Sequence, residues 1–199
     1  ASARGHKTII NLLLKHHANV DLSDVNDVSP LDVAIAGGHG IIAKKLINSG
    51  ALAKDSVGLH FAVRKGNTDM IQLLLAHGWN PNALYSINRT PLHLAIDKGC
   101  KDIVSILLQN EASASVNALN SLSQSPLHNA IALGHTEMVI VVLEGGADVN
   151  LCTENGQPAL HITLAKITGI RGRQESSAAC LIVMLTQHLY RRGAAYRMI

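Results

Sequence analysis

The chain of 199 residues contains few aromatic and few charged side chains. Phe, Tyr and Trp together make up 3% of the sequence, and Asp, Glu, Lys and Arg make up 16%. The bases of single-stranded nucleic acids stack on aromatic side chains, so this scarcity, with a formal net charge of only +3, argues against a nucleic-acid partner. Hydrophobic residues reach 47%, which indicates a folded chain rather than a disordered one.

Cysteines and long apolar runs are also scarce. Cys100, Cys152 and Cys180 are odd in number and far apart, and they form neither a disulfide framework nor a CxxC metal pair. They favour a reducing, intracellular setting, in the cytoplasm or the nucleus, and each thiol is expected to be buried. The longest apolar runs, Met138–Leu143 and Ala179–Leu185, are far shorter than the roughly 18 residues of a membrane span. The sequence therefore predicts no insertion into a membrane, and no signal peptide opens it.

A short block that ends in Leu-His recurs along the chain and indicates its architecture. Thr90-Pro91-Leu92-His93 is the most complete copy, and Ser125-Pro126-Leu127-His128 is the next. The repeated leucines are separated by 28, 33, 35 and 33 residues and lie at Leu31, Leu59, Leu92, Leu127 and Leu160. A period near 33 predicts one small unit that is stacked into an elongated array, without a single central core.

Each unit is predicted to form two helices. Thr90 is suited to cap a helix, Pro91 to occupy its first turn and Gly99 to end it. A second helix is predicted from about Asp102 to Gln109 by its broad apolar face. The same order of cap, helix, glycine and second helix recurs in the other copies. Strict alternation of apolar and polar residues, which is typical of long strands, is rare. The sequence therefore predicts an all-α stack of antiparallel helix pairs, joined by turns or short β-hairpins.

Three stretches resemble ankyrin repeats: TPLHLAIDKG at 90–99, SPLHNAIALGHTEMVIVVLEGGADVN at 125–150 and GHKTIINLLLKHHANVD at 5–21. The resemblance spans essentially the whole chain and implies a single ankyrin-repeat domain over 1–199, with the shape of a curved solenoid. It implies a partial repeat at 1–22, repeats at 23–51, 52–83, 84–117 and 118–151, and a divergent repeat at 152–199. Because the sequence starts and stops within a repeat, the chain is expected to be a fragment of a longer array.

The repeat period is broken in three places. The 28-residue interval predicts a stunted loop at 50–57, and the 35-residue interval predicts two extra residues at 110–117. A 14-residue insertion is predicted around 168–181, with its polar part at 168–177. The segment 166–199 is also basic, because it holds six Lys and Arg residues against one Glu.

The eleven histidines form no recognisable metal or catalytic motif. His60, His93, His128 and His161 occupy the Leu-His slot, where the resemblance implies hydrogen bonds to neighbouring turns. The others follow glycines or lie at the ends of second helices, where a partly cationic ring suits the helix dipole. Motifs for a hydrolase elbow, a phosphate loop or a metalloprotease are missing. The sequence predicts no metal, no cofactor and no enzyme activity, and nothing selects the one open alternative, a Cys–His pair.

Function in such a stack is expected on side chains that the repeat itself does not need. By the resemblance, these lie at the loop tips: Val25, Asn26, Val28, Tyr85, Ser86, Ile87, Arg89, Ser121, Leu122 and Gln124. They also lie just before the glycines that end the first helices: Arg64, Lys65, Asp97, Lys98, Leu133 and Lys166. Lys65, Lys98 and Lys166 share one slot in three units, so they are expected to line a basic stripe, joined by Arg64 and Arg89. Apolar tips beside a charged stripe favour a protein-binding face; the alternative is that these lysines only solvate a helix surface.

Two hypotheses for function follow. The first is a non-catalytic adaptor or scaffold module that binds a partner protein or peptide, with acidic character, through the concave groove and the loop tips. The second places the partner on the inserted basic segment near the C-terminus. The chain would then belong to the substrate-recognition region of a ubiquitin ligase, or to the cytosolic ankyrin region of a signalling enzyme or channel.

Overall fold

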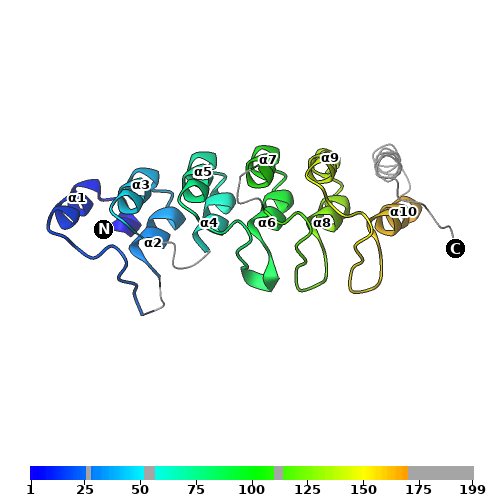
Figure 1. Cartoon of the computed structure of the whole chain (residues 1–199), viewed down its shortest axis with the longest axis horizontal. Coiled ribbons are helices and arrows are strands. Elements are labelled where there is room, and N and C mark those ends of the chain that lie inside the picture. Colours follow the sequence, from blue (N-terminus) through cyan, green and yellow to red (C-terminus); the bar gives the residue numbers. More distant parts are fainter. Residues whose placement is uncertain (26–27, 52–56, 110–113, 170–199) are drawn as a thin grey trace.

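The protein is a row of helix pairs arranged in two layers (Figure 1). The computed structural model describes residues 1–25, 28–51, 57–109 and 114–169. The outer layer contains α1 (Lys7–Lys15), α3 (Gly40–Asn48), α5 (Thr68–Ala76), α7 (Lys101–Gln109) and α9 (Thr136–Glu144). The inner layer contains α2 (Pro30–Ala36), α4 (Val57–Lys65), α6 (Pro91–Asp97), α8 (Pro126–Leu133) and α10 (Ala159–Gly169). The predicted all-α stack of helix pairs is therefore confirmed.

Short elements connect and flank these helices. The 3-10 helix η1 (Ser2–Arg4) precedes α1, and η2 (Ser86–Asn88) lies at the tip of the loop between α5 and α6. The described ranges contain only isolated β-bridges, Tyr85 with Arg89 and Cys152 with Pro158, in the protruding loops. Across these same ranges, every helix is too short or too polar to pass through a bilayer.

The inner helices begin where the sequence predicts, because the same cap recurs. Ser29, Thr90 and Ser125 each accept a hydrogen bond on the side-chain oxygen from the backbone N–H three residues later. The third residue of the helix returns the bond to the backbone N–H of the cap, which completes a capping box. A proline follows each cap at a position where its missing N–H costs nothing.

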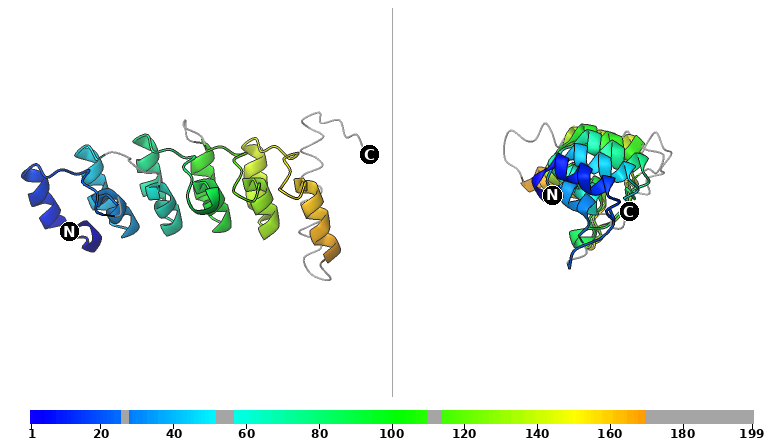
Figure 2. Two further views of the ribbon diagram at one scale, coloured as in Figure 1. Left: turned by 90° about the horizontal axis from the view of Figure 1, so that it is seen from below. Right: turned by 90° about the vertical axis from the view of Figure 1, so that its left-hand side faces the viewer.

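Each helix pair packs against its neighbours in the row (Figure 2). The inner helices form the series α2–α4–α6–α8–α10, and α5, α7 and α9 form a parallel series in the outer layer. The repeated leucines Leu31, Leu59, Leu92 and Leu127 are at most 1% exposed and occupy the same place in successive units. The hydrophobic core is therefore a continuous layer along the row, as the repeat predicts.

One close approach lies between α2 and α4, the first two inner helices, at the start of α4. Gly58 packs beneath the ring of Trp79, which is 3% exposed and follows α5. A Cβ atom at Gly58 would overlap the Trp79 ring and lie 3.1 Å from Cδ1 of Ile35 in α2. This glycine therefore allows the N-terminal helix pairs to pack closely on the rest of the row.

Several sequence-based expectations concern residues outside the described ranges. These are most of the stunted loop at 50–57, part of the extra residues at 110–117, Cys180 and nearly all of the insertion around 168–181. Among the described cysteines, Cys100 is half-buried and Cys152 is exposed. The expectation that every thiol is buried is therefore wrong for Cys152, which lies on a protruding loop instead of a helix.

Candidate protein-binding surface

Buried histidines fix the protruding loops to the inner helices. His60 Nε2 of α4 lies 2.9 Å from the carbonyl oxygen of Arg89, and His93 Nε2 of α6 lies 3.1 Å from that of Gln124. Each bond reaches from one unit to the loop of the next, as the family resemblance implies. The loops at 85–89 and 120–124 are therefore held in fixed positions relative to the helices beneath them.

Burial changes the protonation of two of these rings. Burial lowers the pKa of His93 from 6.5 to about 4, although the bond to the Gln124 carbonyl opposes this shift. Burial also lowers the pKa of His128, and the carbonyls of Leu151 and Gln157 oppose it. In the described part of the chain, His128 Nε2 makes no hydrogen bond of good geometry. Both rings are therefore neutral structural groups at physiological pH.

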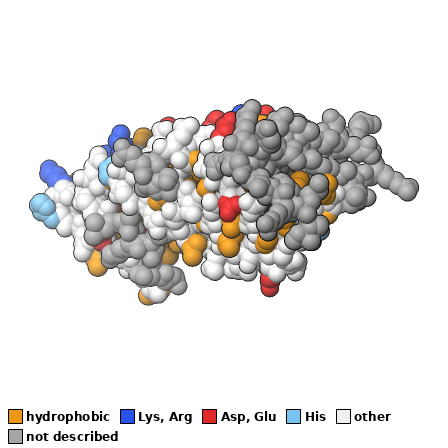
Figure 3. Space-filling view, turned by 45° about the vertical axis from the view of Figure 1, so that its right-hand side comes forward, with side chains coloured by type: hydrophobic (Ala, Val, Ile, Leu, Met, Phe, Trp, Pro, Cys, Tyr) orange, Lys and Arg blue, Asp and Glu red, His pale blue; other side chains and the backbone are white. Residues whose placement is uncertain are grey.

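The loop tips form a row of exposed apolar side chains. Tyr85 and Arg89 exchange two backbone hydrogen bonds of 3.0 and 3.1 Å across the first tip. The Ser121 amide of the next loop donates to the carbonyl of Ile87 at 3.1 Å, so adjacent tips are joined. Figure 3 shows hydrophobic side chains gathered along the lower edge of the molecule. Exposed apolar residues of these loops are Leu84, Tyr85, Ile87, Leu119 and Leu122.

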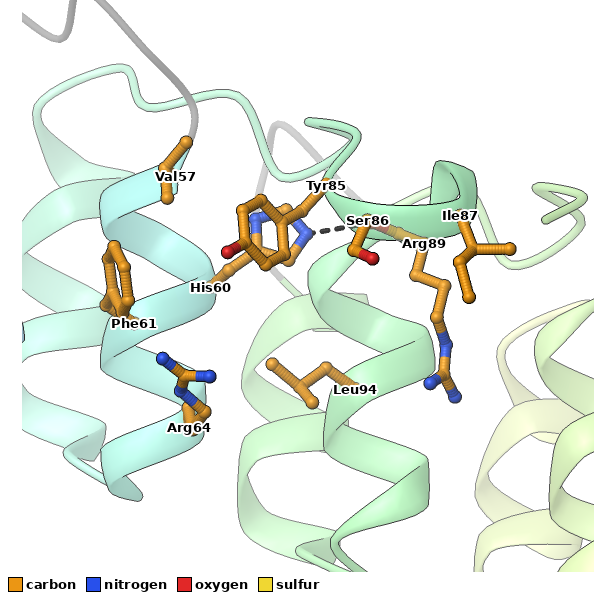
Figure 4. Close-up of a pocket in the computed structure, with 9 residues that line it drawn as sticks. All are labelled: Val57, His60, Phe61, Arg64, Tyr85, Ser86, Ile87, Arg89 and Leu94. Carbon is orange, nitrogen blue, oxygen red and sulfur yellow. Dashed lines mark hydrogen bonds between the residues drawn. The ribbon is translucent and has the colours of Figure 1, made fainter. Parts of the chain in front are cut away.

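A cleft of about 160 Å³ opens beneath the first of these tips (Figure 4). One wall is formed by α4, the other by Leu94 of α6, and the loop at 85–89 covers the top. The residues that line this α4–α6 cleft are Val57, His60, Phe61, Arg64, Tyr85, Ser86, Ile87, Arg89 and Leu94. The lining is mainly apolar, with two arginines and no carboxylate.

Aromatic rings organise the α4 side of the cleft. The Tyr85 ring centroid lies 5.5 Å from that of His60 and 6.4 Å from that of Phe61, in tilted arrangements. The guanidinium carbon of Arg64 lies 5.1 Å from the Phe61 ring centroid, within range of a cation–π contact. Phe61 therefore touches both the loop tip and an exposed cation.

The structure places most predicted site residues at the surface. Exposed residues of that set are Val25, Val28, Arg64, Lys65, Tyr85, Ser86, Ile87, Lys98, Ser121, Leu122 and Leu133, and half-buried ones are Arg89, Asp97 and Gln124. Asn26 lies outside the described residues, as does the side chain of Lys166 in α10. The α4–α6 cleft brings together Arg64, Tyr85, Ser86, Ile87 and Arg89. Its lining does not include the described site residues Val25, Val28, Ser121, Leu122, Gln124 and Leu133.

Arg89 is not a free cation beside the predicted lysine stripe. Its guanidinium forms an ion pair with Asp97, which also accepts a hydrogen bond of 3.1 Å from Asn129. The pair is half-buried, so Arg89 adds no net positive charge to the surface. Gln124 is also engaged within the protein. Its side-chain oxygen accepts a hydrogen bond of 3.2 Å from Asn120, and its backbone carbonyl accepts one from His93.

Two lysines of the predicted stripe do occupy equivalent exposed places. Lys65 is the last residue of α4, and Lys98 follows the last residue of α6. Arg64 is also exposed, and no carboxylate of the described ranges pairs with any of the three. These three cations, Arg64, Lys65 and Lys98, are named the basic rim here.

Phe61 and Leu94 belong to the cleft but are missing from the sequence-based set. Both directly follow the Leu-His pair of their unit, and they are half-buried. The same position holds Val33, Asn129 and Ile162 in the other units, so it varies where its neighbours repeat. That variation was the available signal that the repeat does not fix the residue in this slot.

The described ranges contain no group of three or more His, Cys, Asp or Glu side chains placed to hold a metal ion. The arrangement of the α4–α6 cleft and its rim instead offers apolar contact and positive charge. Both are means of recognising another polypeptide.

Comparison with known proteins gives the same family for most of residues 1–162. Three models of ankyrin repeats match residues 1–47, 54–120 and 107–162. Ankyrin repeat and SOCS box protein 9 of Mus musculus is 29% identical over 120 residues, which are 58% of this chain and 41% of the relative. Ankyrin repeat and SOCS box protein 16 of Homo sapiens is 38% identical over 92 residues, 44% of this chain and 20% of the relative.

A third relative, Rabankyrin-5 of Mus musculus, is 33% identical over 126 residues, 55% of this chain and 11% of the relative. The chain thus spans less than half the length of each of these three relatives. The matched ranges contain the helix pairs, the Leu-His slots and the loops described above. The chain therefore belongs to the ankyrin-repeat family, whose fold is a non-catalytic module for protein–protein interaction.

Proposed function

We propose that this chain binds a partner protein of acidic character through its inner helices and loop tips, without catalysing a reaction. The observation that carries the proposal is the α4–α6 cleft, an apolar hollow of about 160 Å³ beside exposed apolar tips and the basic rim. An exposed apolar patch bordered by charge is typical of a protein interface. The rigid loops support the same reading, because a preformed surface loses little conformational entropy on binding.

The acidic character of the partner follows from the balance of charge around the cleft. Arg64, Lys65 and Lys98 are exposed, while the nearby carboxylate of Asp97 is neutralised by Arg89. Complementary charge at an exposed rim mainly raises the association rate and fixes orientation. The apolar and tyrosine contacts would supply most of the affinity.

The test reverses the charge of two rim residues together, Lys65→Glu and Lys98→Glu. We expect retention of the partner from a cell extract to fall, and the affinity for the purified partner to weaken at least about tenfold at physiological salt. Lys15→Glu with Lys44→Glu is the matched control, because it makes the same charge change on exposed residues of α1 and α3 in the outer layer. Equal partner binding by the rim variant and the control would refute the proposal.

A second candidate site is the inserted basic segment, whose residues 170–177 lie outside the described ranges. It is kept as a candidate because residues 166–199 contain six Lys and Arg residues against one Glu. Removal of residues 169–175 would abolish partner binding under this candidate and leave it intact under the first. Lys65→Glu with Lys98→Glu should leave partner binding intact under this second candidate and weaken it under the first.

A further inference from the structure

We infer that the α4–α6 cleft holds one large apolar side chain of a partner segment, and that an acidic residue next to this anchor pairs with Arg64. The inference rests on the proposed function and adds to it a particular recognition element. The occupant is an extended or helical stretch of another protein, with Leu or an aromatic residue as the anchor and Asp or Glu close to it.

The walls of the cleft select an apolar anchor. Val57 and Phe61 lie on one side, Leu94 on the other and Tyr85 above, as Figure 4 shows. A hollow of about 160 Å³ is of the size that a single side chain fills, and filling it removes apolar surface of both partners from water. A nucleic acid would instead require a dense row of cations along its phosphates, and the cleft walls do not provide one.

Arg64 supplies the charge that selects the neighbouring acidic residue. Its guanidinium lies against the Phe61 ring and is exposed, and it forms no ion pair with a described carboxylate. Arg89 also lines the cleft, but Asp97 already occupies its guanidinium. A guanidinium in cation–π range of an aromatic ring still has N–H groups that can bind a carboxylate with two hydrogen bonds.

Ile87 provides an independent sign that the cleft is a binding site. This residue adopts φ 61° and ψ 35°, a left-handed conformation that is unfavourable for a β-branched side chain. Ile87 is 58% exposed at the mouth of the cleft, on a loop that is fixed by the His60 bond. Strain that persists at an exposed apolar position is typical of sites shaped for a ligand.

The probe for the experiment is a display library of random short peptides, selected against the full chain. We expect the enriched peptides to share one large apolar residue with Asp or Glu close to it. Selection against Arg64→Glu should keep the apolar residue and replace the acidic preference by Lys or Arg. Peptides without a shared anchor, no enrichment, or an unchanged acidic preference with Arg64→Glu would overturn the inference.

Two variants locate the binding of the enriched peptides. Phe61→Ala should weaken it about tenfold or more, and Ile87→Asn should do the same while leaving the melting temperature equal or higher, because Asn tolerates the left-handed conformation. Leu22→Asn is the control, since Leu22 is a 68% exposed loop residue far along the chain from the cleft residues. Full affinity in both cleft variants would overturn the inference.

These outcomes separate the inference from the proposed function. If the peptide results are negative while Lys65→Glu with Lys98→Glu still abolishes partner binding, the anchor is wrong and the interaction surface stands. If the peptides bind as expected and the rim variant retains its partner, the acidic docking along the rim is wrong.

Discussion

At the scale of single residues, His93 shows how one side chain can belong to two parts of the fold. Its Nδ1 atom lies 2.9 Å from Oγ1 of Thr90, within the cap of its own helix, and Nε2 reaches the Gln124 carbonyl of the next loop. Both contacts are satisfied at once by the neutral ring with its proton on Nε2. A second proton on Nδ1 would break the cap, which agrees with the lowered pKa.

The depressed pKa of His93 predicts a stability that depends on pH. The unfolded chain takes up this proton near pH 6.5 and the folded chain only near pH 4, so the stability contributed by the neutral ring is lost as the pH falls through that window. The loss amounts to about 3 kcal/mol at most from this group. The free energy of unfolding, measured by urea denaturation at several pH values between 6.5 and 4, would show this loss.

The variant His93→Gln isolates this contribution. We expect it to be less stable than the native chain at neutral pH but to show a shallower decline in the free energy of unfolding between pH 6.5 and pH 4. His128, whose pKa is lowered in the same direction, leaves part of the decline in place. Parallel declines in the two proteins would show that His93 is not responsible.

At the scale of elements, asparagine side chains link one protruding loop to the next on the outer side of the row. Asn82 accepts from the backbone N–H of Ser115, and Asn117 accepts from that of Asp148 at 2.8 Å. The two bonds join successive units at the same place, just after each outer helix. They complement the histidine bonds, which fix the same loops from the inner side.

Loss of one such link should have a measurable but modest effect. Asn117→Ala removes the acceptor of the Asp148 amide, and because both residues are exposed, water replaces part of the bond. We expect the free energy of unfolding to fall by about 1 kcal/mol in a chemical denaturation experiment. Asn155→Ala, at an exposed turn position of the following loop, serves as the control and should change it by less than half as much.

The sequence predicted the elements better than the pairings between their side chains. Cap, proline and glycine positions are local signals, and they located α2, α6 and α8 to within a residue or two. The ion pair of Arg89 with Asp97 could not be predicted, since it depends on how the loop at 85–89 folds back over α6. Phe61 was missed for a different reason: its position within the unit looked like part of the repeated core.

At the scale of the whole molecule, stability depends on how well each unit packs on the next. In such a row, the energy of folding is nearly a sum of the units and of the contacts between neighbours. Gly58 lies at one of these contacts, where the Trp79 ring and Ile35 leave no space for a methyl group. The helices before α4 are coupled to the rest of the row partly through this contact.

A methyl group at that point should uncouple the two parts of the row. We expect Gly58→Ala to lower the free energy of unfolding and to split denaturant unfolding into two steps, with α1–α3 unfolding first. Spectroscopic probes placed near each end of the chain would report the two steps separately. Gly40→Ala is the matched control, because its Cβ would meet only the Met70 Cε atom at 3.6 Å and alanine favours a helix. One sharp transition in Gly58→Ala, at the native midpoint, would contradict this expectation.

The walls of the α4–α6 cleft come from two successive units of the row. Its width therefore depends on the angle between those units, and any bend of the row at that point opens or narrows it. An anchor seated between α4 and α6 resists such a bend in both directions. Occupation of the cleft thus stiffens a solenoid at one joint, and tension along the row in turn changes how tightly the anchor is held.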